Sequence, residues 1–485
     1  MQDICNNKVA LKGFWEQNYH NMVIKRVSFI EAGSTGLHGF SKFPMPRLGT
    51  VLLSTILRER GYEVKAFIED VAEPDWSFIE NSDLVCISII TPTAIKSYKL
   101  AKRPKSLGIP VIIGGAHPTF LPDEALEYAD FVIRGEGEHT LVELLQCIER
   151  GTPALMEIKG LSYRERDGRI VHNPSREFIE DLDSLPQPDF SLVHNWNQSY
   201  SYPVSTSRGC VYDCKFCSVI GIFGRNYRFK SVETTLKELK YVASVSKATN
   251  FIVDDNFAAK KSRTKEILRG MISEGIKMRW SAQVRTDVAR DQELLRLMAD
   301  SGCHTLGIGF ESVNPRTLQE YNKKQNLEDI ISCITAVKDH SIHIHGMFVL
   351  GADTDDVETI HRTADFAASF GIDTIQFLIL TPLPGTPLFD DMIKNGRLFH
   401  KDWSKYDVQH VVFRPRLMSP TTLQIETFKA MGRFYSWKYI LKHLAKLDFH
   451  YAALGIFGKT TIHKLLKASS AYLDDLDLTK ESVVD

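Results

Sequence analysis

Three of the chain's eight cysteines are gathered within eight consecutive positions. Cys210, Cys214 and Cys217 stand in the segment SRGCVYDCKFCSV (207–219), with gaps of three and two residues between them. Thiols at such spacing are candidates for a disulfide pair, a zinc site or an iron–sulfur cluster. Each of these needs a different set of partners, so the rest of the chain must distinguish them.

The remaining cysteines stand alone in the sequence: Cys5, Cys86, Cys147, Cys303 and Cys333. This pattern is typical of buried free thiols in a reducing cytoplasm, and a disulfide within the triplet would leave one thiol over. Structural zinc takes four ligands, and no fourth Cys or pair of His follows at a matching interval. A [4Fe–4S] cluster normally takes four thiolates, so three would leave one iron open to an exogenous group. The spacing favours such a cluster, with zinc and a disulfide as the weaker alternatives.

Length and charge set the broad class. The chain has 485 residues, 43% of them hydrophobic and 25% charged, with a net charge of −1. This length predicts two or three domains, and the charge balance predicts no nucleic-acid partner. The start MQDICNNKVALKGFW lacks the charged start and apolar run of a secretory signal. The sequence also has no uninterrupted apolar run of about 18 residues, the length that a transmembrane helix needs. We therefore expect a cytoplasmic protein.

After an N-terminal extension over residues 1–25, residues 26–150 alternate apolar runs with helical patterns. Strands are expected at KRVSFIEAG (25–33), EVKAFIED (63–70), DLVCISII (83–90), PVIIGG (110–115) and DFVIRG (130–135). A helix over 49–62 is expected to end at Gly61. Alternation of apolar strands with helices predicts an α/β domain with a doubly wound parallel sheet.

Ligands of such sheets bind beyond the carboxyl ends of the strands. The loops expected there are rich in Gly, Ser and Thr, which let a backbone approach a ligand and donate hydrogen bonds. The candidate binding residues are Ser88 and Thr91 in SIITPT, Gly114 and Gly115 in GGAHPTF, and Gly135 and Gly137 in RGEGEHT. The alternative is that these loops are simply tight turns.

A second alternation follows a linker that contains proline, over residues 151–200. Strands are expected at 202–207, 250–255, 279–284, 304–310, 343–350 and 374–380. Six β/α units are too few for an eightfold barrel, so residues 201–395 are predicted to form a partial (β/α)6 barrel, and the cysteines follow its first strand. The helix expected over 232–245 places Leu236, Leu239 and Val242 on one face. Residues 396–485 read as a helical, aromatic and basic C-terminal region.

The segment CVYDCKFC, with Phe216 before its last cysteine, resembles the signature of radical S-adenosylmethionine enzymes. The resemblance implies that Cys210, Cys214 and Cys217 hold a [4Fe–4S] cluster and that its open iron chelates S-adenosylmethionine. Cleavage of that cofactor yields a 5′-deoxyadenosyl radical, which abstracts hydrogen from an unactivated carbon. The radical chemistry is then the cofactor's, and the protein orients it.

Further polar residues stand at strand ends where this family would place cofactor-binding groups. They are Asp254 and Asp255 in FIVDDNF, Gln283 and Arg285 in SAQVR, and Glu311 in GIGFES. Arg285 is a partner for a carboxylate, and Glu311 for a ribose or amine. Each alone is weak, because an acidic residue at such a position is about as often a helix N-cap.

The domain that precedes the cysteines is similar to that of the cobalamin-binding class of the same family. This resemblance rests on GGAHPTFLPDEAL and RGEGEHTLVELL, and it implies that the loops described above hold a corrin. The motif D-x-H-x-x-G, whose His ligates cobalt, is absent, and His38 and His117 lie in suitable loops without that context. We therefore expect either a corrin without a protein His ligand or a vestigial domain without cobalamin.

The two resemblances together imply a cobalamin-dependent C-methyltransferase. The overall likeness, including FIEAGSTGLHGFSKFPMPRLGTVLL, is to bacteriochlorophyllide side-chain methyltransferases, which implies a large apolar tetrapyrrole substrate and an electron donor such as flavodoxin or ferredoxin. The alternatives are a hopanoid or other lipid methylase, a radical cyclase or C–C bond-forming enzyme without cobalamin, and a carrier without catalysis. The helical segment FYSWKYILKHLAKL (434–447), apolar on one face and basic on the other, also allows peripheral membrane contact.

Overall fold

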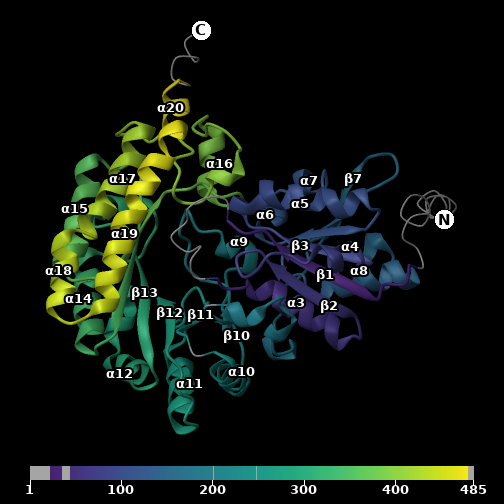
Figure 1. Cartoon of the computed structure of the whole chain (residues 1–485), viewed down its shortest axis with the longest axis horizontal. Helices are drawn as coiled ribbons and strands as arrows, with labels where there is room; N and C mark the ends of the chain where they lie inside the picture. Colours follow the sequence, from purple (N-terminus) through teal and green to yellow (C-terminus); the bar gives the residue numbers. More distant parts are fainter. Residues whose placement is uncertain (1–21, 35–43, 200, 247, 479–485) are drawn as a thin grey trace. The chain divides into compact units, whose positions relative to one another are not determined.

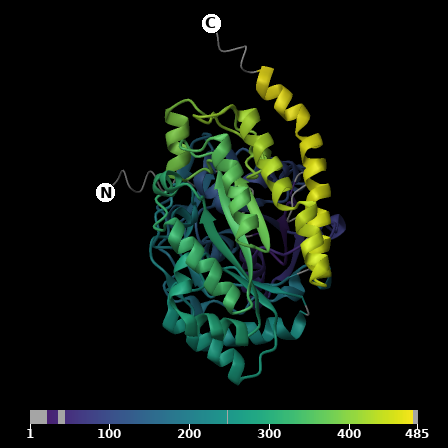
Figure 2. The ribbon, with the colours of Figure 1, turned by 90° about the vertical axis from the view of Figure 1, so that its left-hand side faces the viewer.

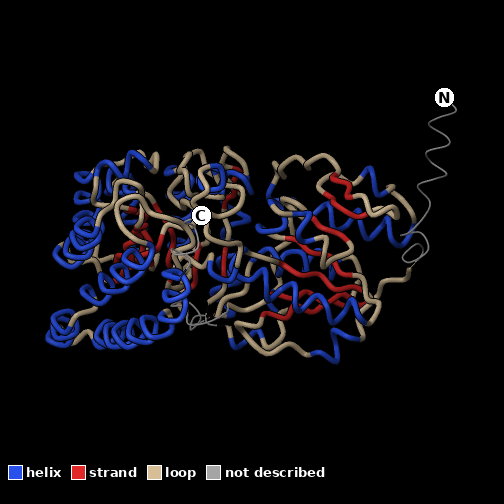
Figure 3. Tube along the Cα trace, turned by 90° about the horizontal axis from the view of Figure 1, so that it is seen from above, coloured by secondary structure: helices blue, strands red, loops and turns tan. Residues whose placement is uncertain are grey.

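A computed structural model describes residues 22–34, 44–199, 201–246 and 248–478 of the chain (Figure 1). These residues form two compact units. The first contains 22–34, 44–199 and 222–224, and the second contains the other described residues from 201 onward. Each unit has its own wholly or mainly parallel sheet with helices packed on it (Figure 3).

The sheet of the first unit has the strand order β2-β1-β3-β4-β5-β6-β7. Its parallel strands are β1 (Arg26–Glu31), β2 (Glu63–Ile68), β3 (Leu84–Ser88), β4 (Val111–Gly114) and β5 (Phe131–Ile133). They are apolar and largely buried, as parallel strands covered on both faces must be. From β1 the chain continues to β2 on one side, and then to β3, β4 and β5 on the other side of β1. Ligands of this architecture bind at the carboxyl ends of the two strands between which the order reverses, here β1 and β3.

Within the described residues, six helices follow these strands and lie on both faces of the sheet (Figure 1). They are α3 (Leu48–Glu59), α4 (Trp76–Glu80), α5 (Ala94–Ser106), α6 (Ala116–Phe120), α7 (Pro122–Ala125) and α8 (Glu138–Arg150). Helix α3 packs against α8, while α4 lies beside α5, where the Arg103 guanidinium stacks 4.3 Å from the centre of the Trp76 ring. The predicted doubly wound α/β fold is confirmed, and α3 ends before Gly61, whose φ is +93°.

The segment 151–200, expected as a linker, contributes structure to the first unit. Strands β6 (Leu161–Arg164) and β7 (Ile170–His172) form a hairpin that extends the sheet antiparallel to β5. Further along, Ile179, Leu182 and Leu185 pack against the buried face of α3. These strands have three or four residues each, too short for a periodic pattern to be recognised in the sequence.

The second unit carries six parallel strands in chain order. They are β8 (Pro203–Val204), β11 (Asn250–Ile252), β12 (Trp280–Val284), β13 (Cys303–Glu311), β14 (His343–Leu350) and β15 (Thr374–Ile379). Strands β8 and β15 do not pair with each other, so the predicted partial barrel of six strands is confirmed. The connecting helices are α10 (Val232–Val245), α11 (Lys261–Ser273), α12 (Gln292–Asp300), α13 (Pro315–Glu320), α14 (Leu327–Asp339), α15 (Val357–Ser369) and α16 (Pro387–Lys394).

Side chains alternate across the barrel strands. On one side Phe310, Phe348 and Phe377 are fully buried and contact one another, with ring centroids 5.6 and 5.4 Å apart. The opposite side carries polar residues and glycines together with apolar residues such as Met347 and Leu378. Helix α10 buries Leu236, Leu239 and Val242, as its spacing predicts.

The C-terminal helices belong to the same compact unit as the barrel. They are α17 (Pro420–Phe434), α18 (Trp437–Ala445), α19 (Phe449–Ala468) and α20 (Ser470–Leu478). Helix α17 packs on α15 and β15, and α19 packs on α17 and α18, so the predicted helical region lies beside β15, the last strand of the open barrel (Figure 2). None of the described helices is long and apolar enough to cross a membrane.

Candidate functional site

The cysteines lie in a loop whose two ends are tied together. Strand β9 (Ser207–Arg208) pairs antiparallel with β10 (Arg228–Phe229), and the loop over 209–227 runs between them, with the short helix α9 (Val219–Phe223) inside it. The loop follows β8, the first barrel strand, and therefore begins at its carboxyl end. That end is where β/α barrels place their functional loops.

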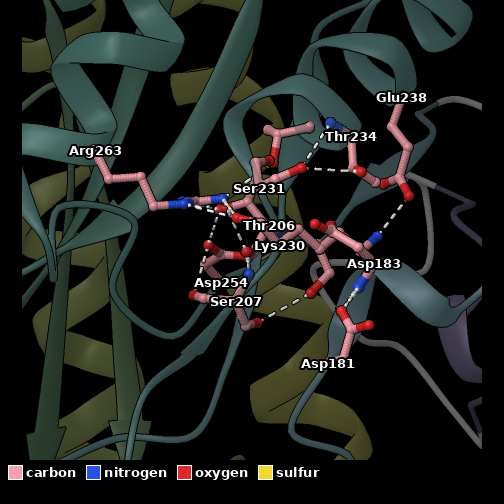
Figure 4. A network of polar contacts seen from close by, with 12 residues as sticks. Asp181, Asp183, Thr206, Ser207, Lys230, Ser231, Thr234, Glu238, Asp254 and Arg263 are labelled. Carbon is pink, nitrogen blue, oxygen red and sulfur yellow. Dashed lines mark hydrogen bonds and ion pairs between the residues drawn. The ribbon is translucent and has the colours of Figure 1, made fainter.

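Asp254, just after β11, anchors the start of this loop (Figure 4). Its carboxylate accepts hydrogen bonds from the backbone N–H groups of Thr206 and Ser207 at 2.6 and 3.1 Å, and from their hydroxyls at 2.6 and 2.7 Å. Arg263 adds a hydrogen bond to the Thr206 carbonyl at 3.1 Å. Burial raises the pKa of Asp254, and the four hydrogen bonds oppose that rise. Both oxygens of this predicted cofactor ligand are thus engaged in holding the residues before the cysteines.

The residues after α13 hold the middle of the loop. The Phe216 ring packs edge-on against Tyr321, with ring centroids 5.0 Å apart. The backbone N–H of Lys215 donates to the Tyr321 carbonyl at 3.3 Å, and the Asn322 side chain donates to the Asp213 carbonyl at 3.0 Å. Tyr321 itself is buried, and its hydroxyl donates to the backbone of β14. The loop is therefore fixed independently from both sides.

The three thiols share a mostly buried environment. Burial raises the pKa of the Cys217 thiol to about 12 and also raises that of Cys214, which the nearby Lys323 ammonium partly offsets. Such thiols stay protonated unless a cation binds them, because metal coordination deprotonates a thiol. Cys210 Sγ lies 3.6 Å from the Tyr227 hydroxyl.

Two observations bear on what this loop could hold. Within the described part of the chain, no three His, Cys, Asp or Glu side chains converge as ligands of a single metal ion. An iron–sulfur cubane does not require such convergence, because each thiolate ligates a different iron. In addition, the buried Asn256 Oδ1 has no hydrogen-bond partner among the described residues. The donor set fits a cluster, and a cofactor bound to it would supply the missing hydrogen bond.

The other predicted cofactor residues lie at the same edge of the barrel. Gln283 and Arg285 stand at the end of β12, and the Arg285 guanidinium stacks 3.6 Å from the centre of the Tyr212 ring, which belongs to the cysteine loop. Glu311 ends β13 at a register shift, with φ +63°. Its carboxylate accepts a hydrogen bond of 2.6 Å from Lys323, and both side chains are buried. The structure thus brings Gln283, Arg285 and Glu311 to the edge that carries the cysteines.

Asp255 differs from its neighbour Asp254. Its side chain is exposed, yet protein atoms crowd around it, and this desolvation together with the Asp254 carboxylate raises the pKa of Asp255 to about 7. It faces the cysteine loop closely enough to raise the pKa of Cys217. Of the two acids in FIVDDNF, Asp255 is the one that remains accessible to a ligand.

In the first unit, a buried carboxylate lies at the carboxyl end of β1, where the strand order reverses. Glu31 ends β1, and its carboxylate accepts hydrogen bonds from the Thr50 hydroxyl and the Arg47 backbone N–H. Arg47 reaches across to the carbonyl of Ser88, the last residue of β3, at 3.2 Å. Burial raises the pKa of Glu31, against the opposing effect of the Arg47 charge. The predicted residue Ser88 therefore lies at the reversal point itself.

The predicted glycines leave the neighbouring strand ends without side chains. Gly114 ends β4, Gly115 follows it, and Gly135 and Gly137 follow β5. A Cβ on Gly115, whose φ is +107°, would lie 2.6 Å from the Ile89 carbonyl oxygen, whereas a Cβ on Gly135 would meet open space. This bare edge fits a broad flat ligand that approaches the backbone.

The two histidines considered as cobalt ligands have different outcomes. His117 is fully buried, with Nδ1 3.3 Å from the Thr91 hydroxyl and Nε2 3.2 Å from a Glu124 carboxylate oxygen. Both ring nitrogens of His117 are thus within hydrogen-bond distance of protein side chains, and the Thr91 hydroxyl is one of the partners. His38 lies outside the described residues.

Several residues at these edges were missed in the sequence. Lys323, Gln325 and Tyr227 lie outside the motifs quoted above, while Asn256, Glu31 and Arg47 lie inside quoted segments but were not singled out as candidates. Gln325 donates to the Gly309 and Phe310 carbonyls at 3.1 and 2.9 Å and so supports the end of β13. For Lys323 and Gln325 the sequence offered one signal, the polar run YNKKQN (321–326) between two helices. By itself such a run is typical of an ordinary loop.

Comparison with known proteins assigns two stretches of the chain to known families. Residues 204–393 match the family model of the radical SAM superfamily, and residues 37–145 match that of the B12 binding domain. The chain is 32% identical to an uncharacterized methyltransferase, PH0819, of Pyrococcus horikoshii over 85% of this chain and 90% of that protein. It is 31% identical to the bacteriochlorophyllide d C-12(1)-methyltransferase of Chlorobaculum tepidum over 75% of this chain and 76% of that protein. The structure of the methyltransferase TsrM from Kitasatospora setae, with cobalamin and a [4Fe–4S] cluster bound, has a TM-score of 0.71 at 16% identity, covering 92% of this chain and 100% of that one.

The chain therefore belongs to the radical S-adenosylmethionine enzymes that carry a cobalamin-binding domain. It is a radical S-adenosylmethionine methyltransferase, and its cofactors are a [4Fe–4S] cluster, S-adenosylmethionine and cobalamin. Such an enzyme acts on a small molecule and requires a reductant.

Proposed function

We propose that this enzyme methylates an unactivated side-chain carbon of a (bacterio)chlorophyllide-type tetrapyrrole in pigment biosynthesis. The observation that carries the proposal is the similarity over three quarters of the chain to the bacteriochlorophyllide d C-12(1)-methyltransferase. A second relative, the C-8(2)-methyltransferase of the same organism, is 26% identical over 74% of the chain. Both act on side chains of one macrocycle, which supports a large, flat and mainly apolar substrate.

In this proposal Cys210, Cys214 and Cys217 ligate three irons and leave the fourth to S-adenosylmethionine. Arg285 would pair with the carboxylate of that cofactor and Glu311 with its amine or ribose, because both lie at the edge that carries the cysteines. Gln283 and the accessible Asp255 would complete the contacts. Asp254 positions the cysteine loop through its four hydrogen bonds and does not touch the cofactor.

The corrin would lie over the carboxyl ends of β1, β3, β4 and β5. Ser88, Thr91, Gly114, Gly115, Gly135 and Gly137 form that edge. Because His117 is committed to Thr91 and Glu124, we propose that it does not ligate cobalt. Backbone groups and small side chains would then bind the corrin by shape and hydrogen bonding.

When bound, these cofactors supply one-electron cleavage of S-adenosylmethionine and the carriage of a methyl group. The protein's part is to fix positions and to keep water out, since misplacement of reacting groups by about 1 Å can cost about 100-fold in rate. The Lys323–Glu311 pair and the Arg285–Tyr212 stack hold the charged groups at the cysteine edge in fixed orientations. For the required electron we propose a small donor of the flavodoxin or ferredoxin type.

The test is an anaerobic assay of the reconstituted enzyme with bacteriochlorophyllide d, a reductant and S-adenosylmethionine deuterated in its methyl group. The expected product carries one added methyl group with all of its deuterium, detected by mass spectrometry together with 5′-deoxyadenosine. A strain without this gene should accumulate a pigment lighter by one methylene. A methylated hopanoid-type lipid instead would indicate the activity of the hopanoid C-2 methylase, which is 24% identical over 74% of the chain. A ring-closed product without methyl transfer would contradict the proposal in favour of a cyclase.

A further inference from the structure

The C-terminal helices α18 and α19 expose an unusual concentration of large apolar side chains. Within the described part of the chain fifteen large hydrophobic side chains are exposed, and six of them lie between residues 437 and 456. They are Trp437, Leu441, Leu444, Leu447, Phe449 and Ile456. Exposed apolar groups scattered singly need no explanation, but a cluster marks an interaction surface.

The spacing of these residues places them on two adjoining helical faces. In α18, Trp437, Leu441 and Leu444 recur at intervals of four and three, while Tyr439, Ile440 and His443 of the same helix are buried. In α19, Phe449 and Ile456 are seven residues apart, and so lie on one side of that helix. The two helices pack against each other, and Lys459 of α19 lies 5.5 Å from the centre of the Trp437 ring. We call this surface, residues 437–459, the hairpin face.

The charge around the hairpin face is strongly one-sided. Residues 433–467 contain seven Lys and Arg but a single acidic residue, Asp448, whereas the whole chain has 59 basic and 60 acidic residues. Lys438, Lys442 and Lys446 are exposed on α18 and in the turn after it. Partial burial, together with the charges of Lys446 and Lys338, lowers the pKa of Lys442.

We propose that the hairpin face binds the surface of a membrane that contains anionic phospholipids. Apolar side chains flanked by lysines match the two layers of such a surface, an acyl boundary beneath negatively charged headgroups. The long lysine side chains can reach the headgroups while Trp437, Leu441 and Phe449 enter the boundary. Because none of the described helices can cross a bilayer, the contact is interfacial. This inference does not depend on the identity of the methylated substrate.

The test is cosedimentation of the full-length holoenzyme with vesicles of phosphatidylcholine alone and with added phosphatidylglycerol. We expect binding to the phosphatidylglycerol vesicles that weakens with salt, because screening removes the lysine contribution. Substituting Lys438→Gln, Lys442→Gln and Lys446→Gln together should weaken binding on the order of a hundredfold, at about 1 kcal/mol for each lysine. The matched control replaces Lys237, Lys240 and Lys277, three exposed lysines elsewhere in the same unit, and should bind like the wild type.

The apolar part is tested by Leu441→Ser with Phe449→Ser, whose side chains are 61% and 65% exposed and therefore contribute little to folding. We expect binding to fall at least tenfold, with no change for the control pair Leu107→Ser and Met156→Ser, which are 54% and 59% exposed. Vesicles should also shift the tryptophan emission to shorter wavelength, and Trp437→Phe should remove that shift.

Three results would overturn the proposal. The first is the absence of binding to vesicles of either composition. The second is equal binding by the wild type and by both variants. The third is a self-association that the Leu441→Ser and Phe449→Ser pair abolishes while no vesicle binding is seen, which would identify the hairpin face as a contact between copies of the chain.

Discussion

The carboxyl ends of the two parallel sheets are built in opposite ways. In the second unit the edge is formed by charged and polar side chains that hold one another, such as Asp254 with the backbone of Thr206 and Ser207, and Glu311 with Lys323. In the first unit the corresponding edge beyond β4 and β5 is rich in glycines, with Gly114 at the end of β4, Gly115 after it, and Gly135 and Gly137 after β5. The first arrangement suits a ligand attached at fixed points, and the second suits a broad ligand that needs space.

This contrast predicts different responses to mutation. Where individual side-chain atoms bind the ligand, as at the cysteine loop, removal of one of those atoms should abolish binding. Where attachment depends on an open backbone surface, the effect of a substitution should follow the volume added and the backbone conformation required. Substitutions at each edge can therefore be chosen to break one cofactor site while the other stays intact.

The largest effect is expected for Cys214→Ala. Loss of one of three thiolates should abolish both the iron–sulfur absorbance of the anaerobically reconstituted protein and its cleavage of S-adenosylmethionine. Cobalamin content should not change, because the corrin is held by the other unit. Cys333→Ala, at a buried thiol of α14 away from the cysteine loop, is the matched control and should keep the cluster. A Cys214→Ala protein with full cluster content would show that the three-thiolate assignment is wrong.

A large but incomplete effect is expected for Asp254→Ala. The substitution leaves two buried N–H groups and two hydroxyls without their acceptor, at about 1–3 kcal/mol for each unpaired group. We expect the cysteine loop to loosen, with iron content reduced several-fold and a lower midpoint of thermal unfolding. Its neighbour supplies the control, since Asp255→Ala removes none of these hydrogen bonds. Asp255→Ala should keep the cluster and weaken S-adenosylmethionine binding, and the reverse pattern would exchange the roles of the two acids.

An intermediate effect confined to cobalamin is expected for Gly115→Ala. The added Cβ would lie 2.6 Å from the Ile89 carbonyl oxygen at a residue with φ +107°, so the loops after β3 and β4 must shift. Corrin retention, measured by absorbance after gel filtration, should fall while the iron content stays normal. Gly108→Ala also has a positive φ, +76°, but its Cβ would meet open space. That control should cost about 1 kcal/mol and leave corrin binding unchanged.

How much the sequence could predict depends on whether a feature is local. The cysteine spacing, the strand–helix alternation and the glycines after β4 and β5 are short patterns with direct physical meaning, and they located both edges and the fold. The role of Asp254 was not readable, because it depends on pairing across 48 residues with Thr206. Lys323 was missed for the same reason, since its partner Glu311 is brought to it by the end of β13. The hairpin of β6 and β7 was hidden because two strands of three or four residues carry too little periodicity.

The smallest expected effect lies at the opposite, amino end of the barrel strands, where β/α barrels place stability and not chemistry. His304, at the start of β13, packs against His343 with ring centroids 4.8 Å apart, and burial together with the charges of Arg279 and His343 lowers its pKa to about 4. The folded unit therefore favours neutral His304, so its contribution to stability is present above the unfolded pKa of about 6.5 and is lost as the pH falls from there toward 4. His304→Gln should make the midpoint of thermal unfolding less dependent on pH between about 7 and 5. The iron–sulfur absorbance of His304→Gln should equal that of the wild type, because the substitution lies at the far end of the strands from the cysteine loop; a loss of cluster would show that the two ends of the barrel are coupled.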